Sequence, residues 1–196
     1  TKIDKNIFKN SSVTDIVLPD TVTEIGDNAF TGAPKLKEIS ISNVVTIGAN
    51  AFKGCSALTK VETGDNLVSV GDGAFTGCTK LSQFYSGNKL ESIGKDAFSG
   101  CTDLFRFTLP ATVTSVGDGA FTGCTGIIEV RNLSALTADK GSDALGGLCK
   151  YAWDVFTSES EPSKISDTDG YLVYKQSSGD IFIKYIGIKT IFISPH

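Results

Sequence analysis

Short segments in which apolar and polar residues alternate return along the chain every 22 or 23 residues. Each segment has the form Leu-x-x-apolar-x, often followed by another apolar residue, as in Leu36-x-x-Ile39-x-Ile41 and Leu104-x-x-Phe107-x-Leu109. A period of two is typical of a strand with one buried face. A second short extended piece follows and ends in Ile-Gly or Val-Gly. Each unit therefore predicts a strand, a turn and a second extended segment.

The dipeptide Ala-Phe closes each unit and fixes the register of the repeat. Its five phenylalanines are Phe30, Phe52, Phe75, Phe98 and Phe121, with one glycine four residues before and another two residues after each of them. This pattern predicts a short helical turn with Phe pointing inward, Ala allowing the coils to approach, and the second Gly ending the turn with a positive φ. Because one unit cannot bury its own apolar face, the units must stack, with their strands in a parallel sheet.

The ends of the chain keep less of this pattern. A degenerate first unit covers residues 7–19, and the segment 131–147 retains only part of the repeat. We therefore expect a repeat body over residues 1–149 and a separate segment over 150–196. Two alternating stretches around Ser177–Gly179 predict a β-hairpin in that segment. Trp153 and Phe156 are expected to anchor the junction in the core.

Two phrases, Leu18-Pro-Asp-Thr-Val-Thr-Glu-Ile-Gly-Asp-Asn-Ala-Phe30 and the corresponding stretch from Leu109 to Cys124, resemble the consensus of the BspA-like leucine-rich repeats of bacterial and protist surface proteins. The resemblance covers roughly residues 7–149, and the tail around Asp169–Lys175 resembles a hairpin insert of the same family. It implies a mostly β solenoid of the α/β type: a right-handed leucine-rich-repeat superhelix with a parallel sheet on its concave side, 22–23 residues per repeat and a C-terminal β-hairpin. Residues 150–196 would hold the insert and the start of a further, truncated repeat.

The same resemblance implies a function and a location. It suggests an adhesion or recognition module outside the cell or on its surface, which binds a host matrix protein, other cells or glycans. The alternative from a different class is a rigid structural spacer within a larger surface protein. The oligomeric state stays open, and so does a carbohydrate-binding accessory role.

The composition and charge of the chain limit the classes of partner that it can bind. The formal net charge is −4 over 196 residues, and no basic stretch could follow a phosphate backbone, so nucleic acid is not an expected partner. No apolar run approaches the roughly 18 residues of a membrane-spanning helix. The chain has no Met and no signal peptide, so we expect a mature or excised segment whose targeting signal and anchor lie elsewhere.

The residues of catalysis and metal binding are scarce. The single histidine is His196, the last residue, which argues against Ser-His-Asp, Cys-His and His-based metal sites. No coherent pair of carboxylates stands out. We therefore expect a protein that is not an enzyme and that holds no cofactor or metal.

Four of the five cysteines occupy one repeat column: Cys55, Cys78, Cys101 and Cys124. We interpret them as buried free thiols that act as small apolar residues, because coils about 4.8 Å apart hold their Cβ atoms slightly too far apart for disulfides. Cys149 lies off the register and is expected to be the most reactive of the five.

Two further motifs have competing interpretations. Asp27, Asp72 and Asp118 share a column and are predicted to cap the turn that follows; a calcium site is disfavoured because Ala49 and Lys95 interrupt the column. Sequons for N-glycosylation occur at Asn10-Ser-Ser and Asn132-Leu-Ser and matter only in a eukaryotic source.

The outward face of the parallel sheet is the candidate binding site, since solenoids bind through such extended faces. The residues that flank the inward apolar positions are Glu38, Ser40, Lys60, Glu62, Gln83, Tyr85, Arg106, Thr108, Glu129 and Arg131. The predicted ligand-binding residues among them are Gln83, Tyr85, Arg106, Thr108, Glu129 and Arg131. Tyr and Arg are enriched in interaction hot spots, so Tyr85, Arg106 and Arg131 come first. The competing interpretation is a sheet face that is merely solvated.

Overall fold

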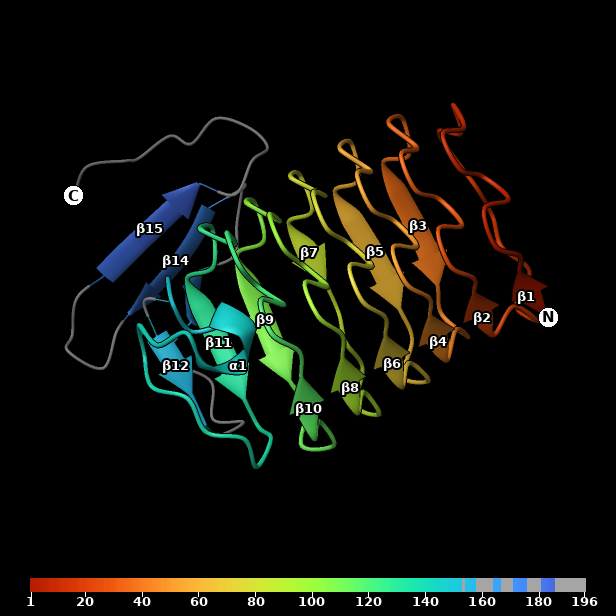
Figure 1. Ribbon diagram of the computed structural model, residues 1–196. Coiled ribbons are helices and arrows are strands. Elements are labelled where there is room, and N and C mark those ends of the chain that lie inside the picture. The colour runs from red at the N-terminus through yellow and green to blue at the C-terminus, as the bar shows by residue number, and fades with distance from the viewer. Residues whose placement is uncertain (153, 158–163, 167–170, 176–180, 186–196) are drawn as a thin grey trace. The chain divides into compact units, whose positions relative to one another are not determined.

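The computed structural model describes residues 1–152, 154–157, 164–166, 171–175 and 181–185. The chain forms two compact units, Thr1–Ser158 and Glu159–His196. The first unit is a stack of coils that follow one another from the N-terminus, which lies at the right of Figure 1, towards the left.

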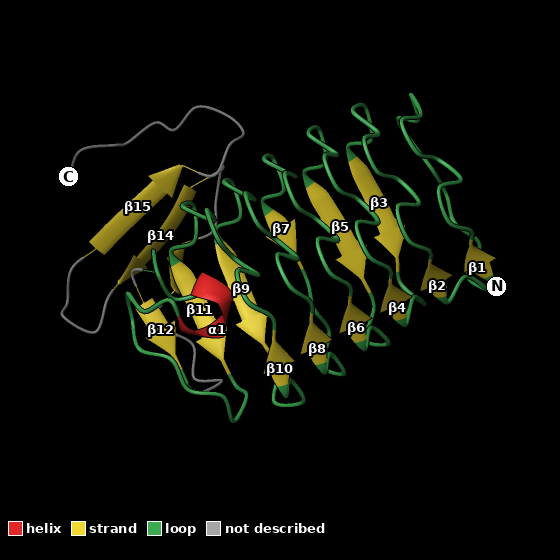
Figure 2. Cartoon of the chain, viewed as in Figure 1, coloured by secondary structure: helices red, strands yellow, loops and turns green. Residues whose placement is uncertain are grey.

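Every coil of the first unit contributes short strands to parallel sheets (Figure 2). Two-residue strands form a six-stranded sheet made of β1 (Lys2–Ile3), β2 (Glu24–Ile25), β4 (Thr46–Ile47), β6 (Ser69–Val70), β8 (Ser92–Ile93) and β10 (Ser115–Val116). The other strands form two three-stranded sheets, made of β3 (Glu38–Ile41), β5 (Lys60–Thr63) and β7 (Gln83–Phe84), and of β9 (Arg106–Leu109), β11 (Glu129–Asn132) and β12 (Asp154–Phe156). The predicted mostly β solenoid with parallel strands is confirmed.

The turns around Ala-Phe are not helical. Hydrogen bonds of the i→i−3 type close them, such as Ala29 N–H to the Gly26 carbonyl (3.2 Å). A left-handed residue two positions before each Phe, such as Asn28 with a φ of 54°, breaks any helix there. Among the described residues, the one assigned helix is the four-residue α1 (Ala144–Gly147), and none is long and apolar enough to cross a membrane.

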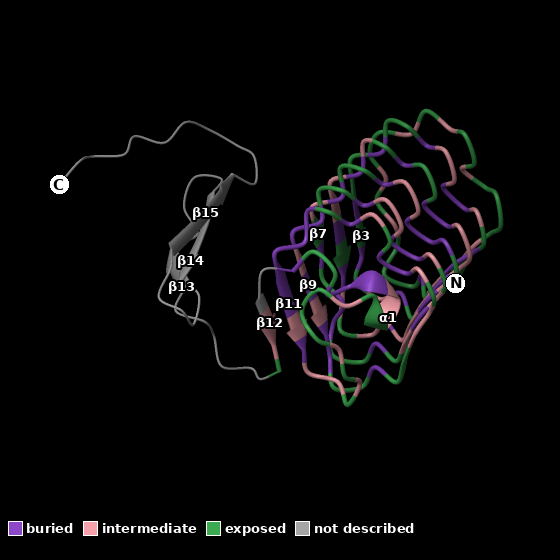
Figure 3. Ribbon diagram, turned by 60° about the vertical axis from the view of Figure 1, so that its left-hand side comes forward, coloured by how far each residue is buried: buried purple, intermediate pink, exposed green. Residues whose placement is uncertain are grey.

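A ladder of phenylalanine rings fills the core between the sheets. Phe52, Phe75 and Phe98 stack on one another with ring centroids 5.1 Å apart, and all three are fully buried. The ladder extends to Phe8 at one end and Phe121 at the other. Figure 3 shows buried residues recurring along the coils of this unit. The inward position expected for the repeated Phe is confirmed.

Two glycine columns have different physical causes. The glycine after each Phe has a positive φ, as expected; for Gly77 it is 74°. The glycine before each Ala-Phe is required by close approach, because a Cβ on Gly94 would lie 2.5 Å from the backbone nitrogen of Asp72 in the preceding coil. The hydrogen bond from Gly94 N–H to the Val70 carbonyl (2.8 Å) draws these two coils together.

The cysteine column forms a second buried ladder. Cys55, Cys78, Cys101 and Cys124 are buried free thiols, as predicted. Each donates a hydrogen bond to a Phe carbonyl in the preceding coil, and the Sγ–O distance for Cys124 and Phe98 is 3.0 Å. The thiols therefore help to tie the coils together while filling space.

The expectation that Cys149 lies off the register was wrong. Strand β12 pairs with β11 so that Val155 lies opposite Val130, which makes this coil 25 residues long. Cys149 precedes Val155 by the same number of residues as Cys124 precedes Val130, so it continues the cysteine column. It is fully buried, and burial raises the pKa of its thiol, which suppresses the reactive thiolate.

The buried thiols predict a loss of stability in alkali. Burial raises the pKa of Cys55 to about 11 and that of Cys124 to about 12, against about 8.5 for an unfolded thiol. Because the folded pKa values are the higher ones, the contribution is complete below about pH 8.5 and is lost as the pH rises towards the folded values. We expect the free energy of unfolding to fall by about 1.4 kcal/mol per thiol per pH unit above about pH 9.

Urea titrations at a series of pH values between about 7.5 and 10 measure how the free energy of unfolding changes with pH. The variant Cys55→Ala serves as the control, because its slope should be smaller by the contribution of one thiol. Iodoacetamide should label none of the five cysteines rapidly without denaturant. A slope that Cys55→Ala leaves unchanged, or rapid native-state labelling of Cys149, would contradict this account.

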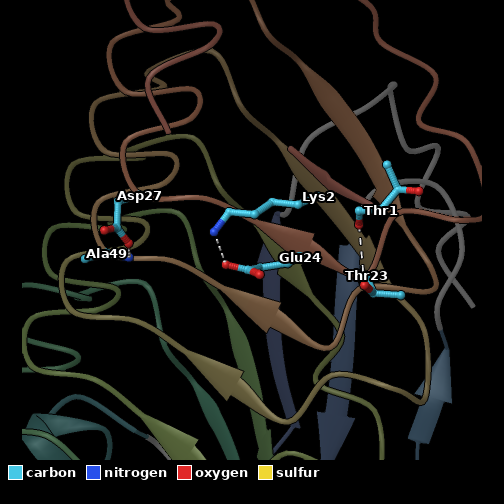
Figure 4. A network of polar contacts seen from close by, with 6 residues as sticks. All are labelled: Thr1, Lys2, Thr23, Glu24, Asp27 and Ala49. Carbon is cyan, nitrogen blue, oxygen red and sulfur yellow. Dashed lines mark hydrogen bonds and ion pairs between the residues drawn. The ribbon is translucent and has the colours of Figure 1, made fainter. Parts of the chain in front are cut away.

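The aspartates do not cap their own turns as predicted. Instead, Asp27 Oδ1 accepts a hydrogen bond from the backbone N–H of Ala49 in the next coil at 2.9 Å (Figure 4), and Asp72 Oδ1 accepts one from Lys95 N–H at 2.7 Å. The reason is that no helix follows, so the free N–H group comes from the neighbouring coil. Asp118 shows no such bond among the described residues. Because Ala49 and Lys95 alternate with the aspartates in this column, no two aspartates of adjacent coils stack on each other and repel.

The first compact unit extends to Ser158, because β12 joins the sheet of β9 and β11. Phe156 is half-buried and lies opposite Arg131 in the register of that pairing. Trp153 lies outside the described residues.

The second unit contains an antiparallel sheet of β13 (Lys164–Ser166), β14 (Tyr171–Lys175) and β15 (Ile181–Tyr185). The pairing of β14 with β15 confirms the predicted hairpin. The turn at Ser177–Gly179, the strand expected at Ile191–Pro195 and His196 lie outside the described residues.

Candidate binding surface on the sheet

The strands β3, β5, β7, β9 and β11 present alternate side chains outward, and we call this surface, together with Tyr85, the sheet face. In β3, Ile39 and Ile41 are buried while Glu38 and Ser40 are exposed, as a strand with one buried face requires. On β5, Lys60 and Glu62 form an ion pair. Both side chains remain about half exposed, so this pair stays open to solvent.

Tyr85 is the large apolar side chain that stands out most on the sheet face. It directly follows β7 and is 56% exposed. Its hydroxyl donates a weak hydrogen bond to Asp65 Oδ1 at 3.4 Å, and the Thr63 hydroxyl donates to its backbone carbonyl. Partial burial, with the Asp65 charge second, raises the pKa of the phenol. Tyr85 is therefore a neutral aromatic side chain that is hydrogen-bonded to Asp65 in the neighbouring coil.

Arg106, Glu129 and Arg131 form a compact ion-pair cluster across β9 and β11. Glu129 lies opposite Arg106 in the register, with 3.2 Å between its Oε2 and Arg106 Nη2, and its Oε1 accepts from Arg131 Nε at 3.0 Å. The Arg106 guanidinium also lies 5.9 Å from the centre of the Phe105 ring. Two guanidinium groups around one carboxylate leave the cluster with a formal charge of +1.

Glu129 is the least accessible of the predicted residues. Its side chain is only 2% exposed, because the two arginines enclose it. It orients the two arginines. Of these, Arg106 keeps 37% of its side chain exposed and Arg131 keeps 20%. Arg106 is therefore the more accessible cation.

The remaining predicted residues lie between these two features. Gln83 is exposed at the start of β7, and Thr108 is half-buried on β9. A hydrogen bond from the buried Ser86 hydroxyl to the Thr108 carbonyl (3.0 Å) joins the two coils where the β3–β5–β7 and β9–β11–β12 sheets meet. Gln83, Tyr85, Arg106 and Thr108 thus come from two successive coils, as the repeat register predicted.

The residues that hold this surface were not recognised from the sequence. Asp65, which binds Tyr85, lies in a loop outside the repeated columns, whereas Ser86 takes the inward position that Ile41 and Leu109 hold in other coils. The two sequons also differ in the structure. Asn132 is buried and its amide donates to the Leu136 carbonyl at 2.6 Å, so it is closed to a glycosyl group, whereas Asn10 is exposed.

The sheet face is suited to binding. Among the described residues, no group of three or more His, Cys, Asp or Glu side chains could hold a metal ion. What the surface offers is an exposed aromatic ring, an arginine oriented by a buried carboxylate and several solvated polar groups, all mounted on strands.

Comparison with known proteins places the chain in a family. Residues 1–128 match a model described as a BspA type leucine rich repeat region, in six copies. A leucine-rich repeat protein from T. pallidum is 30% identical, with a TM-score of 0.68 over 80% of this chain and 74% of that protein. One from Bacteroides ovatus is 33% identical (TM-score 0.51, 56% of this chain, 35% of that one).

A leucine rich cell surface protein from Faecalibacterium prausnitzii is 25% identical, with a TM-score of 0.52 over 92% of this chain and 52% of that one. No curated protein matches the chain. The family model covers well over half of the sequence. The chain therefore belongs to the BspA-type leucine-rich repeat family.

Proposed function

We propose that this chain is a non-catalytic adhesion or recognition module at a cell surface. It binds a host matrix protein, another cell or a glycan through the sheet face. The observation that carries the proposal is the position of Tyr85, exposed and held by Asp65, one coil away from the accessible arginine Arg106.

The geometry favours these two residues for an energetic reason. Tyr and Arg dominate interaction hot spots because each offers a large contact area together with hydrogen bonding. Their anchoring by Asp65 and Glu129 reduces the side-chain entropy that binding would otherwise cost. Strands tied coil by coil supply a rigid support for both.

The location rests on similarity. The F. prausnitzii relative is described as a cell surface protein, and a coil stack suits the display of an extended face to a neighbouring surface. A surface location for this chain remains part of the proposal.

Surface plasmon resonance against a panel of matrix proteins and glycans tests the proposal. For the partner that binds best, we expect Tyr85→Ala and Arg106→Ala each to weaken the affinity about ten-fold or more, because each removes a hot-spot contact. Lys80→Ala, which changes an exposed lysine in the loop before the strand, is the matched control and should leave affinity unchanged. Melting curves verify that all variants stay folded.

Equal affinity of the wild type and both sheet-face variants would place the binding site elsewhere. Absence of binding across the whole panel would favour the rigid spacer instead.

A further inference from the structure

A polar groove of about 480 Å³ opens on the turn edge of the solenoid, away from the residues of the sheet face. Three successive coils line it, with Asn50, Gly73 and Asp96 at equivalent positions, two residues before the Phe of each coil. Coil spacing along the groove follows the 5.1 Å stacking of Phe52, Phe75 and Phe98. Its volume lies within the range of about 300–1,000 Å³ typical of small-molecule sites.

Gly73, which has no side chain, lines the middle of this groove between Asn50 and Asp96. All three equivalent residues have a left-handed backbone: φ is 54° at Asn50, 63° at Gly73 and 52° at Asp96. Asn and Asp tolerate that conformation, so the fold itself does not demand glycine in this coil. A Cβ on Gly73 would lie 2.6 Å from Asn50 Oδ1, so a side chain there would have to displace the Asn50 amide, which itself lines the groove.

The groove is lined by donors and acceptors, several of which have no partner within the chain. The Thr76 hydroxyl donates to the Asp96 carbonyl (2.7 Å), and one oxygen of Asp72 accepts from Lys95 N–H. Among the described residues, the Ser99 hydroxyl and the ammonium groups of Lys53 and Lys95 make no hydrogen bond or ion pair that would occupy them. These groups are available to a ligand.

The charges decide which ligand chemistry fits. Two lysines, Lys53 and Lys95, and two aspartates, Asp72 and Asp96, line the groove, so its formal charge is zero. An anion would meet both carboxylates, and a cation would meet both ammonium groups. The matching ligand is uncharged and carries many hydroxyls, each able to donate and to accept.

We propose that the turn-edge groove binds a neutral saccharide of one or two rings. The lysine and serine side chains donate to its hydroxyls, and the carboxylates of Asp72 and Asp96 accept from them. No aromatic ring lines the groove, so the contact lacks stacking and its affinity falls in the millimolar range. This site is separate from the sheet face and would operate whether or not that face binds a protein.

The test is an NMR titration of the ¹⁵N-labelled protein with maltose, lactose, N,N′-diacetylchitobiose and mannobiose, and with sodium sulfate as the anionic probe. We expect at least one disaccharide to shift the amide signals of Asn50, Gly73 and Asp96. The variant Gly73→Asn should weaken that binding about ten-fold or more, because the new side chain fills the groove.

Gly73→Asn should fold like the wild type, so a loss of binding in this variant can be assigned to the groove. The substitution continues the Asn6, Asn28 and Asn50 column by one coil, so its melting temperature should stay close to that of the wild type. Gly141→Asn is the matched control, because Gly141 has a φ of 81°, no atom within 4 Å of its hypothetical Cβ and no place in the groove, and this variant should bind the disaccharide as the wild type does. No shift with any disaccharide, shifts confined to other residues, undiminished binding by Gly73→Asn, or stronger shifts with sulfate would each overturn the proposal.

Discussion

Replacing Phe75 with alanine should lower the free energy of unfolding by about 3–5 kcal/mol. The ring is fully buried and stacks between Phe52 and Phe98, with Phe84 edge-on at 5.4 Å. Truncation removes the apolar transfer energy, the aromatic contacts on both sides and the packing around the resulting cavity. Urea denaturation followed by circular dichroism measures the change.

Two variants make the result interpretable. Phe75→Leu retains most of the volume and should cost clearly less, which keeps the test informative if the alanine variant fails to fold. Val17→Ala changes a side chain that is 94% exposed and should stay within about 0.5 kcal/mol of the wild type. A similar loss for Phe75→Ala and Val17→Ala would show that the ladder does not stabilise the stack.

The second large effect is expected at Gly94. Its Cβ in Gly94→Ala would lie 2.5 Å from both the nitrogen and Oδ1 of Asp72, and 2.7 Å from the carbonyl carbon of Gly71. Because two of these atoms are backbone, the coils must move apart, and the hydrogen bond from Lys95 N–H to Asp72 Oδ1 is strained as well. We expect a loss of about 3 kcal/mol, the upper end of the overpacking range.

The control for Gly94→Ala is Gly54→Asn. Gly54 has a φ of 72° and no atom within 4 Å of its hypothetical Cβ, and asparagine tolerates that backbone. Its change should therefore cost much less in the same urea titration. Equal losses at the two positions would mean that close approach between coils does not explain the first glycine column.

The sequence predicts most of the coil stack because its information is periodic. Phe75 and Cys78 each belong to a column, and a column reveals an inward position without knowledge of any contact. Cys149 was misplaced because the coil that contains it is longer than the others, and only the pairing of β12 with β11 restores its register. Asp27 was misread because its partner is a backbone group in the next coil.

The candidate site was less predictable for the same physical reason. A binding surface depends on residues that do not repeat, such as Tyr85 and its partner Asp65, and no column marks their contact. The outward direction of Glu129 followed from the strand period, but its enclosure depends on two arginines meeting one carboxylate. Alternation along a strand predicts which side a residue faces and does not predict what covers it.

Hydrogen–deuterium exchange of the protein with and without a bound matrix protein tests the central claim most directly, because it maps the contact without any substitution. The account predicts protection at the strands of the sheet face, centred on residues 83–85 and 106–108, with the turn edge around Gly73 unchanged. Protection confined to the turn edge or to the end coils, with the sheet face exchanging as in the free protein, would contradict it.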